Sequence, residues 1–394
     1  MGDTSSLLRR RTMGASRVTT MELFFDLVFV FATTQLSHLL LAHLTVDGAL
    51  RTALLLVAVW WAWIDTAWAT NWLDPTRRAT RMMLLGAMFT SLIMAAAIPE
   101  AFQARGLAFA AGYAVLQVGR SLFVLWATKP DAALHTNFQR FLAWRTAGAA
   151  LWVAGGIAHD GARIGLWIAA VTVDTIGPLV YFVVPGLGRS HAEEWSIDGG
   201  HLAERCQLFL IVAFGESVLL TGATFGDLAW TLPTSAALAV CFAATATTWW
   251  IYFDAAAERS SEMIAVSDRA GVLGRSAYTY WHLPMVAGII VAAVGDDLII
   301  TDPLDEATTA TAVVTLGGPA LFLAGHAAFT RVVFGHLSVS RVIGAGLLVA
   351  AMPAGARTPP LIVAGAALAV LVGVAVADAI RQPDAEPTST IDIE

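Results

Sequence analysis

Two carboxylates lie one helical turn apart in an apolar stretch of the sequence, and this spacing is suited to ion chemistry. Glu22 and Asp26 stand in residues 21–44, a run rich in Leu, Phe and Val that is long enough to cross a bilayer as a helix. At 100° per residue, both acids share one helix face with Thr33 and Ser37. Because adjacent carboxylates repel each other, one of them stays protonated unless a cation intervenes. The pattern therefore favours proton exchange or cation coordination.

Two other interpretations of these acids stay open at the level of sequence. In the first, an acid of this helix forms a buried ion pair with Arg120 or Arg145 that only fixes a helix contact. In the second, Glu22 lies hydrated at the membrane interface, where a carboxylate stabilises the helix N-terminus, and Asp26 is left alone at depth. Asp26 is accordingly the stronger of the two candidates.

Ionisable side chains recur in the other apolar segments. Each costs about 2.5–3.5 kcal/mol at the bilayer centre on insertion scales, so such residues are functional candidates by default. Glu216, between Gly215 and Ser217, is the deepest acid of its segment and ranks beside Asp26. The candidate binding or ion-coupling residues are Asp26, Glu216, Glu22, Glu204, Arg205, Arg120, Arg145, Asp65, Asp254 and Asp174.

Other residue patterns argue against an enzyme or a metal centre. The nine histidines form no closely spaced cluster on a helix, and Cys206 and Cys241 have no zinc-ligand spacing. No nucleotide-binding glycine loop or serine-hydrolase motif stands in a suitable context. We therefore expect no catalytic residue, no metal and no cofactor.

Asp65 and Asp254 each end a tryptophan-rich stretch, at 60–65 and at 249–254. Aromatic belts at the membrane interface explain such tryptophans as well as an aromatic cage would. We interpret four of them as interfacial anchors: Trp60, Trp61, Trp249 and Trp250.

The composition identifies a polytopic membrane protein. Of the 394 residues, 57% are hydrophobic and 13% are charged, against about 25% charged in soluble domains. The net charge of −7 comes with no basic tract beyond residues 9–11, so we expect a lipid bilayer around the chain and no nucleic acid. The predicted fold class is all-α, with about twelve transmembrane helices. Their apolar windows lie near 22–44, 49–70, 80–98, 106–127, 138–158, 163–184, 204–225, 232–254, 272–294, 308–332, 339–353 and 360–380.

Basic residues predict how these spans are oriented. Most of them fall in loops on the side of the N-terminus, as cytoplasmic loops do, so we expect both termini in the cytoplasm. Only four arginines fall in loops of the opposite side: Arg51, Arg105, Arg163 and Arg357. An acidic stretch at 295–306 is interpreted as a loop of that side that solvates a turn, and the alternative is that its acids gather cations.

Weak internal similarity divides the chain into two halves. The stretches at 60–65 and 249–254 match each other, and each lies in the second span of its half. Because six spans preserve orientation, the two repeats are expected to be parallel, with their axis along the membrane normal. The predicted segments are a basic cytoplasmic segment 1–20, a first repeat 21–184, a cytoplasmic linker 185–203, a second repeat 204–381 and a disordered acidic tail 382–394.

Two motifs resemble those of a known family. Residues 22–32 (ELFFDLVFVFA), followed by 35–39 (QLSHL), are similar to the opening of the bacterial low temperature requirement protein A family. Residues 204–205 (ER) with 214–217 (FGES) resemble the second hallmark of that family. The resemblance implies a multi-pass protein of the bacterial inner membrane, and it implies no particular biochemical activity.

The leading hypothesis is a secondary transporter for an unknown small solute or ion. Asp26 and Glu216, one from the first helix of each half, are expected to line a central polar site, with Arg120 and Arg145 balancing their charge. A buried carboxylate can carry a proton near neutral pH, so proton coupling fits this site. An ion channel built of two six-helix repeats and a non-transporting membrane scaffold are the alternatives. The substrate, the coupling ion and the oligomeric state are left open.

Overall fold

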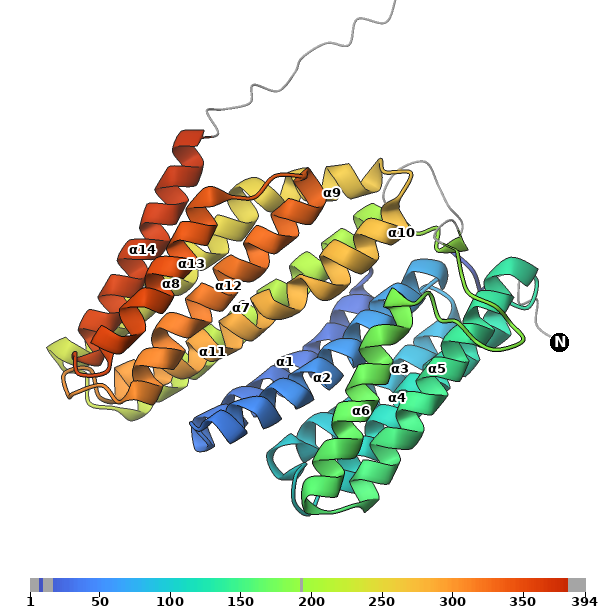
Figure 1. The fold of residues 1–394 in the computed structure, drawn as a ribbon, viewed down its shortest axis with the longest axis horizontal. Coiled ribbons are helices and arrows are strands. Elements are labelled where there is room, and N and C mark those ends of the chain that lie inside the picture. Colours follow the sequence, from blue (N-terminus) through green and yellow to red (C-terminus); the bar gives the residue numbers. More distant parts are fainter. Residues whose placement is uncertain (1–6, 10–16, 192–193, 382–394) are drawn as a thin grey trace, which may run out of the picture.

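The structure is a computed structural model that describes residues 7–9, 17–191 and 194–381, and it is helical throughout these ranges apart from loops and two isolated β-bridges (Figure 1). Residues 10 and 11 of the basic N-terminal tract and the predicted tail 382–394 lie outside the described residues. The long helices are α1 (Thr20–Ala42), α2 (Val46–Trp72), α3 (Arg78–Ala97), α4 (Gly106–Ala127), α5 (Ala132–Ile157), α6 (Asp160–Leu179), α7 (Gly199–Asp227), α8 (Leu232–Tyr252), α11 (His282–Thr301), α12 (Thr309–Phe334), α13 (Val339–Gly355) and α14 (Pro360–Arg381). The short helices are η2 (Ile98–Glu100), η4 (Phe253–Ala257), α9 (Glu258–Ala265), α10 (Ala270–Leu273) and η5 (Gly274–Tyr280), of which η4 and η5 are π-helical.

The expectation of an all-α polytopic membrane protein is confirmed. Ten helical segments of the described chain are long and apolar enough to cross a bilayer. α13 is shorter, at 17 residues, and α5 opens with polar residues that include His135 and Arg140. Length and composition thus identify ten spans, two fewer than the apolar windows predicted.

The helices form two groups that lie side by side (Figure 1). The first group holds α1 to α6, and the second holds α7, α8 and α11 to α14. Within the first group α3, α4, α5 and α6 contact one another in chain order, and α1 packs on α2 and α3. At the boundary between the groups, α1 and α2 pack against α7 and α11.

The helices α1 and α7 run parallel to each other across this boundary. Glu22 lies beside His201, and Asp26 lies beside Arg205, so each step of one turn along α1 is matched by one turn along α7. Further along both helices, Thr34 of α1 contacts Glu216 of α7. The first helix of each group therefore meets its counterpart in the same direction and at the same height.

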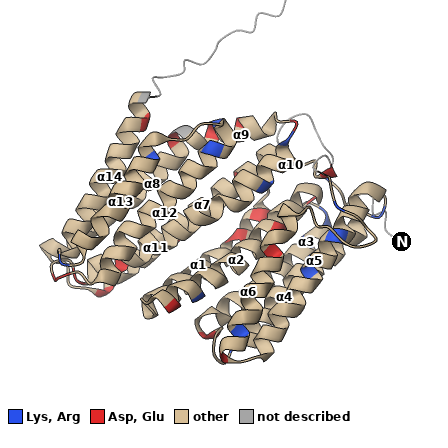
Figure 2. Cartoon of the chain, viewed as in Figure 1, with Lys and Arg blue, Asp and Glu red and all other residues tan. Residues whose placement is uncertain are grey.

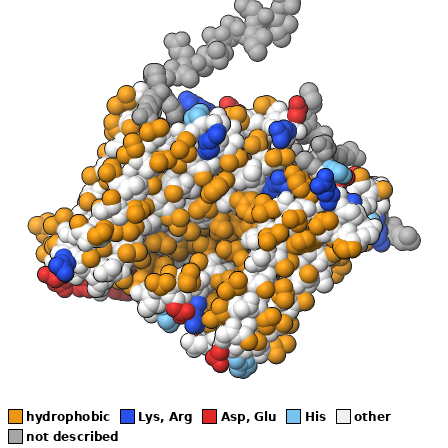
Figure 3. All heavy atoms as spheres, in the orientation of Figure 1, with side chains coloured by type: hydrophobic (Ala, Val, Ile, Leu, Met, Phe, Trp, Pro, Cys, Tyr) orange, Lys and Arg blue, Asp and Glu red, His pale blue; other side chains and the backbone are white. Residues whose placement is uncertain are grey.

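Apolar side chains cover the outside of the bundle. Figure 2 shows that the middle stretches of α8, α12, α13 and α14 carry almost no charged residue, and Figure 3 shows hydrophobic side chains spread over the visible face with charges gathered toward its rims. Large apolar residues such as Phe89, Leu219 and Phe242 are exposed. A surface of this kind matches lipid rather than water.

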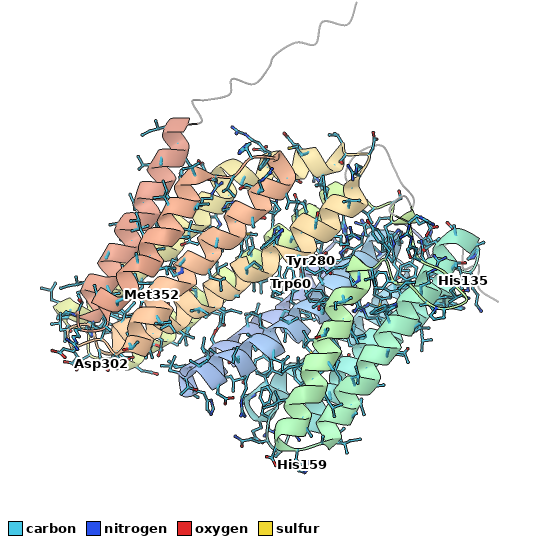
Figure 4. The ribbon with its side chains drawn as sticks, viewed as in Figure 1. Trp60, His135, His159, Tyr280, Asp302 and Met352 are labelled. Atoms are coloured by element: carbon cyan, nitrogen blue, oxygen red, sulfur yellow. The ribbon has the colours of Figure 1, made fainter. Side chains whose placement is uncertain are left out.

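The interpretation of the tryptophans as interfacial anchors is wrong for Trp60 and Trp61. Both side chains are 1% exposed, and Trp60 donates from Nε1 to the carbonyl oxygen of Thr279 at 2.7 Å. Figure 4 shows Trp60 close to Tyr280, where the two groups of helices meet. These two tryptophans are buried between helices and do not lie at the membrane interface, because both faces of α2 are covered by protein. By contrast, Trp249 and Trp250 of α8 are exposed, as anchors would be.

The acidic stretch at 295–306 is only partly a loop. α11 continues to Thr301, so Asp296 and Asp297 are helical residues, and Asp302 marks the end of the helix away from α10 (Figure 4). Asp296 is buried together with Ile299 and Ile300. The helix continues past the two acids because the apolar residues that follow them pack against other helices. The prediction of a loop did not take this apolar run into account.

Close packing of α11 on α12 provides a test of this fold. A Cβ atom built on Gly318 would lie 2.4 Å from the backbone nitrogen of Ala292, whereas one built on Gly317 would meet only the flexible end of Met352, at 3.3 Å. We expect Gly318→Ala to lower the free energy of unfolding by about 1–3 kcal/mol, because the helices must separate to fit the methyl group. Gly317→Ala, the matched control, is expected to change it little. Thermal unfolding in mild detergent measures both, and equal effects would contradict the packing described.

Candidate functional site

Four ionisable side chains meet where α1 packs against α7. Arg205 donates from Nη2 to Oδ1 of Asp26 at 2.7 Å, and His201 donates from Nε2 to Oε1 of Glu22 at 2.9 Å. All four residues are at most 2% exposed. We call them the boundary cluster: two acids spaced i,i+4 on one helix face two bases spaced i,i+4 on a parallel helix. Such pairing satisfies charges that lipid would not tolerate.

Residues of α2 support the boundary cluster from one side. Trp63 donates from Nε1 to Oδ1 of Asp26 at 2.7 Å, and its ring lies 5.7 Å from the guanidinium of Arg205. The amide of Asn71 lies 3.3 Å from Nδ1 of His201, which faces away from Glu22. The carboxylate of Asp26 and the ring of His201 are thus each contacted by a residue of α2 that takes no part in the ion pairs.

Glu22 combines two of the roles that the sequence left open. It closes a capping box with Thr19, whose backbone N–H donates to Oε2 at 2.9 Å, so it does stabilise the start of α1. It is nevertheless 0% exposed and lies against His201 and Arg9, the latter at 3.4 Å. The alternative of a hydrated interfacial carboxylate is therefore wrong, because α7 and the segment around Arg9 cover it.

The hydrogen bonding of Asp26 and Arg205 is incomplete. Among the residues that the structure describes, Oδ2 of Asp26 and both Nε and Nη1 of Arg205 have no hydrogen-bond partner. A guanidinium and a carboxylate can form two parallel bonds, and here they form one. Burying charged groups with spare donors and acceptors is unfavourable, so this contact is held less firmly than its short distance suggests.

A second set of charges, the charge network, links four helices of the first group. Arg145 of α5 contacts Asp65 of α2 through Nε at 2.8 Å and Asp174 of α6 through Nη1 at 2.9 Å. Arg120 of α4 contacts the same carboxylate of Asp65 at 3.3 Å. Two acids and two arginines make the network neutral, and all four are buried.

The charge network corrects one expectation from the sequence. Arg120 and Arg145 balance Asp65 and Asp174 of their own group, not Asp26 or Glu216. The reason is geometric, because α4 and α5 lie on the far side of α2 from the boundary with α7. Neutral donors complete the network: Tyr113 and Trp152 both donate to Oδ2 of Asp174, at 2.8 Å and 3.1 Å.

Three acids of the second group have only neutral partners. Glu216, 1% exposed, accepts a hydrogen bond from the hydroxyl of Thr34, while its Oε1 has no partner in the described part of the chain. Asp296 faces Ser217, with 3.4 Å between Oγ and Oδ2, and Asp297 accepts from the hydroxyl of Thr224. None of the three forms an ion pair with a described Lys, Arg or His, and we call them the uncompensated acids.

Asp26 and Glu216 therefore do not meet in one central site. Asp26 faces Arg205, whereas the partner of Glu216 is Thr34, eight residues or about 12 Å further along α1. Both acids lie on the boundary between the two groups, at different depths. Asp26 and Glu216 thus occupy two separate positions along the contact between α1 and α7 and do not face each other.

Glu204 and Asp254 join none of these clusters. Glu204 is half-buried and accepts from the backbone N–H of Val18, just before α1, at 3.1 Å. Asp254 is exposed in the π-helical η4, whereas Asp65, its counterpart in the proposed repeat, is buried.

Sequence reasoning missed several residues of these clusters. His201 stands four residues before Arg205, the same spacing as Glu22 and Asp26, and that match was the available signal. Asp296 was assigned to a loop, and Trp63 was not distinguished from the other tryptophans of α2. No three His, Cys, Asp or Glu side chains converge on a metal-sized site within the described ranges.

Comparisons with known proteins place the chain in a family. The family model for bacterial low temperature requirement A protein matches residues 17–376. An uncharacterized protein of Rhizobium meliloti (strain 1021), RA0937, is 41% identical over 345 residues, which cover 87% of this chain and 84% of that protein. No solved structure matches the chain. The match spans both groups of helices, and the chain belongs to the bacterial low temperature requirement A protein family.

Proposed function

We propose that this protein is a secondary transporter of the bacterial inner membrane that couples solute movement to protons through Glu216. One observation carries the proposal: the buried acids are divided into two kinds. Asp65, Asp174 and Asp26 have arginine partners, whereas Glu216 and Asp296 have only neutral ones.

The physical consequence concerns what the uncompensated acids can bind. A carboxylate that is buried without a cation loses far more solvation energy than a hydrogen bond restores, so it takes up a proton or a cation. Glu216 lies on the boundary between the two helix groups, beside Thr34. A proton bound there is placed where relative movement of the groups would change its access to water.

The arrangement of helices supports two parallel six-helix repeats, 21–184 and 204–381, joined by the linker 185–203. In this comparison the six helices α1 to α6 correspond, in order, to α7, α8, α11, α12, α13 and α14. The same contacts then recur in both groups: the first helix packs on the second and the third, and the second packs on the sixth. The third helix packs on the fourth, the fourth on the fifth and the fifth on the sixth. Transporters with such repeats alternate their access by rocking one repeat against the other.

The boundary cluster fits the role of a contact that opens during this rocking. It lies at the N-terminal ends of α1 and α7, which the distribution of basic residues places toward the cytoplasm. Asp26 and Arg205 keep spare hydrogen-bonding atoms, so water can solvate them as the groups separate. The channel hypothesis needs no such contact between moving halves.

Proton flux in proteoliposomes tests the proposal. The protein is reconstituted with an internal pH dye, a potassium gradient with valinomycin sets the potential, and pooled amino acids, organic cations or organic anions are added. We expect a saturable, solute-dependent proton flux that Glu216→Gln reduces at least tenfold, because the amide cannot carry the proton. Glu262→Gln is the matched control, since Glu262 is exposed on α9.

The channel and scaffold hypotheses each predict a different result in this proton-flux measurement. A channel gives a flux that needs no solute and does not saturate. A scaffold gives no flux with any pool while the protein stays folded, and either result contradicts the proposal.

A further inference from the structure

A pocket lined by aromatic side chains lies beside the charge network, at the boundary between the two groups. Its empty space measures about 750 Å³ when the open solvent at its mouth is included. α2, α4, α5 and the end of α6 form most of the wall, and α10 with η5 closes it from the second group. Its aromatic lining includes Trp61, Trp68, Trp72, Phe138, Phe141 and Trp195.

The aromatic walls support one another. Trp72 meets Phe138 edge to face, with ring centroids 5.3 Å apart, and Trp195 at 5.7 Å. Trp68 packs on Trp72 at 5.8 Å. Such contacts fix the rings, so the pocket presents flat apolar faces that suit a flat apolar ligand.

The charge of the pocket is positive. Asp65 and Arg120 line its base and neutralise each other within the charge network. Arg275 of η5 lines the wall, where it donates to the carbonyl oxygen of Pro178 at 2.9 Å and lies over the ring of Tyr181 at 4.3 Å. No carboxylate in the described part of the chain pairs with Arg275, so its charge is left for a ligand.

The polar group left over in this pocket is a hydrogen-bond donor. Trp61 is 1% exposed, lines the pocket, and has an indole N–H without a partner among the described residues. The indole N–H groups of Trp68 and Trp72 are already used, by the hydroxyl of Thr279 and the carbonyl of Ser196. A ligand that completes the pocket must therefore accept a hydrogen bond, and a negative charge would also satisfy Arg275.

Access to the pocket is open from the end that carries α10. Trp195, Gly271 and Val272 line both this pocket and an adjoining one, the vestibule, which Asp268 and Arg269 also line. Arg275 and Thr279 enter the wall from a π-helical segment, a rare geometry that often accompanies functional sites. Since α10 and η5 follow α7 and α8 in the chain whereas α2, α4, α5 and α6 belong to the first group, a bound ligand would touch both sides of the boundary.

We propose that this pocket binds an organic anion with a flat apolar body, such as an aryl carboxylate. The carboxylate accepts hydrogen bonds from Trp61 and Arg275, and the ring lies among the tryptophans. That this anion is the transported solute rests on the proposed function, whereas its binding to the pocket does not.

Equilibrium binding to the full-length protein in nanodiscs tests the assignment, with calorimetry as the readout. The probes are 1-naphthoate, the neutral 1-naphthamide and the cationic 1-naphthylmethylammonium. We expect 1-naphthoate to bind at least tenfold more tightly than the other two. Arg275→Met should abolish this preference, Arg275→Lys should keep part of it, and Trp61→Phe should weaken binding several-fold because the indole N–H is lost together with part of the ring. Arg269→Met, which removes an exposed arginine of the vestibule, should leave the affinity unchanged.

Two outcomes would overturn the pocket assignment. One is equal affinity for the three probes, and the other is undiminished 1-naphthoate binding by an Arg275→Met protein that unfolds at the wild-type temperature. Selective binding without solute-coupled proton flux would keep the pocket and refute the transporter, while coupled flux without 1-naphthoate binding would do the reverse.

Discussion

Replacement of Arg145 by methionine is expected to lower the free energy of unfolding by about 3–5 kcal/mol, because it breaks two buried ion pairs at once. Arg145 is 1% exposed and contacts both Asp65 and Asp174. Methionine fills similar space, so lost packing contributes little. Asp65 keeps Arg120, but Asp174 is left with only neutral donors, and a buried charge without a counter-ion is the main source of the loss.

The measurement is reversible unfolding in mild detergent, followed by the fluorescence of the many buried tryptophans. Arg51→Met serves as the control, since Arg51 forms an exposed i,i+4 pair with Asp47 that contributes at most about 1 kcal/mol. Adding Asp174→Asn to Arg145→Met should recover part of the stability, because the amide carries no charge. Equal losses for Arg145→Met and Arg51→Met would show that the network is not buried as described.

The second large effect is expected at the boundary cluster. Arg205→Met leaves Asp26 buried with Trp63 as its remaining donor and should also cost about 3–5 kcal/mol. Asp26→Asn in the same protein should restore much of the loss, so the two substitutions should be non-additive by about 0.5–3 kcal/mol. Unlike the Arg145 variant, Arg205→Met loosens a contact between the groups rather than within one.

Hydrogen–deuterium exchange distinguishes these two consequences. In Arg205→Met, peptides from the first turns of α1 and α7 should exchange faster, while peptides from α5 stay protected, because the contact between Asp26 and Arg205 is lost locally. Arg145→Met should show the opposite pattern, with α5 and α6 affected first. Uniform acceleration in both variants would mean that the two clusters unfold as one unit and that the boundary is not a separate contact.

Local properties of the chain explain what could be predicted from its sequence. Hydropathy over about 20 residues places the long helices, and the opening motif of α1 identified the family, because both depend only on neighbours along the chain. The same reasoning found that Asp26 and Glu216 would be buried. Burial of an acid follows from the apolar residues around it, whichever way the helix faces.

Tertiary structure alone decided which partner each buried charge obtains. Asp26 and Arg205 are 179 positions apart, and their contact depends on how α1 and α7 are rotated and on their parallel alignment. From its residue type, Arg120 could pair equally well with Asp26 or with Asp65. It pairs with Asp65 because α4 packs against α2 and not against α1. Hydropathy carries no information about helix rotation or neighbours. The sequence by itself thus determined that this protein buries acids and bases within a helical membrane bundle, and packing decided which acids obtain a cationic partner and which obtain only neutral ones among the described residues.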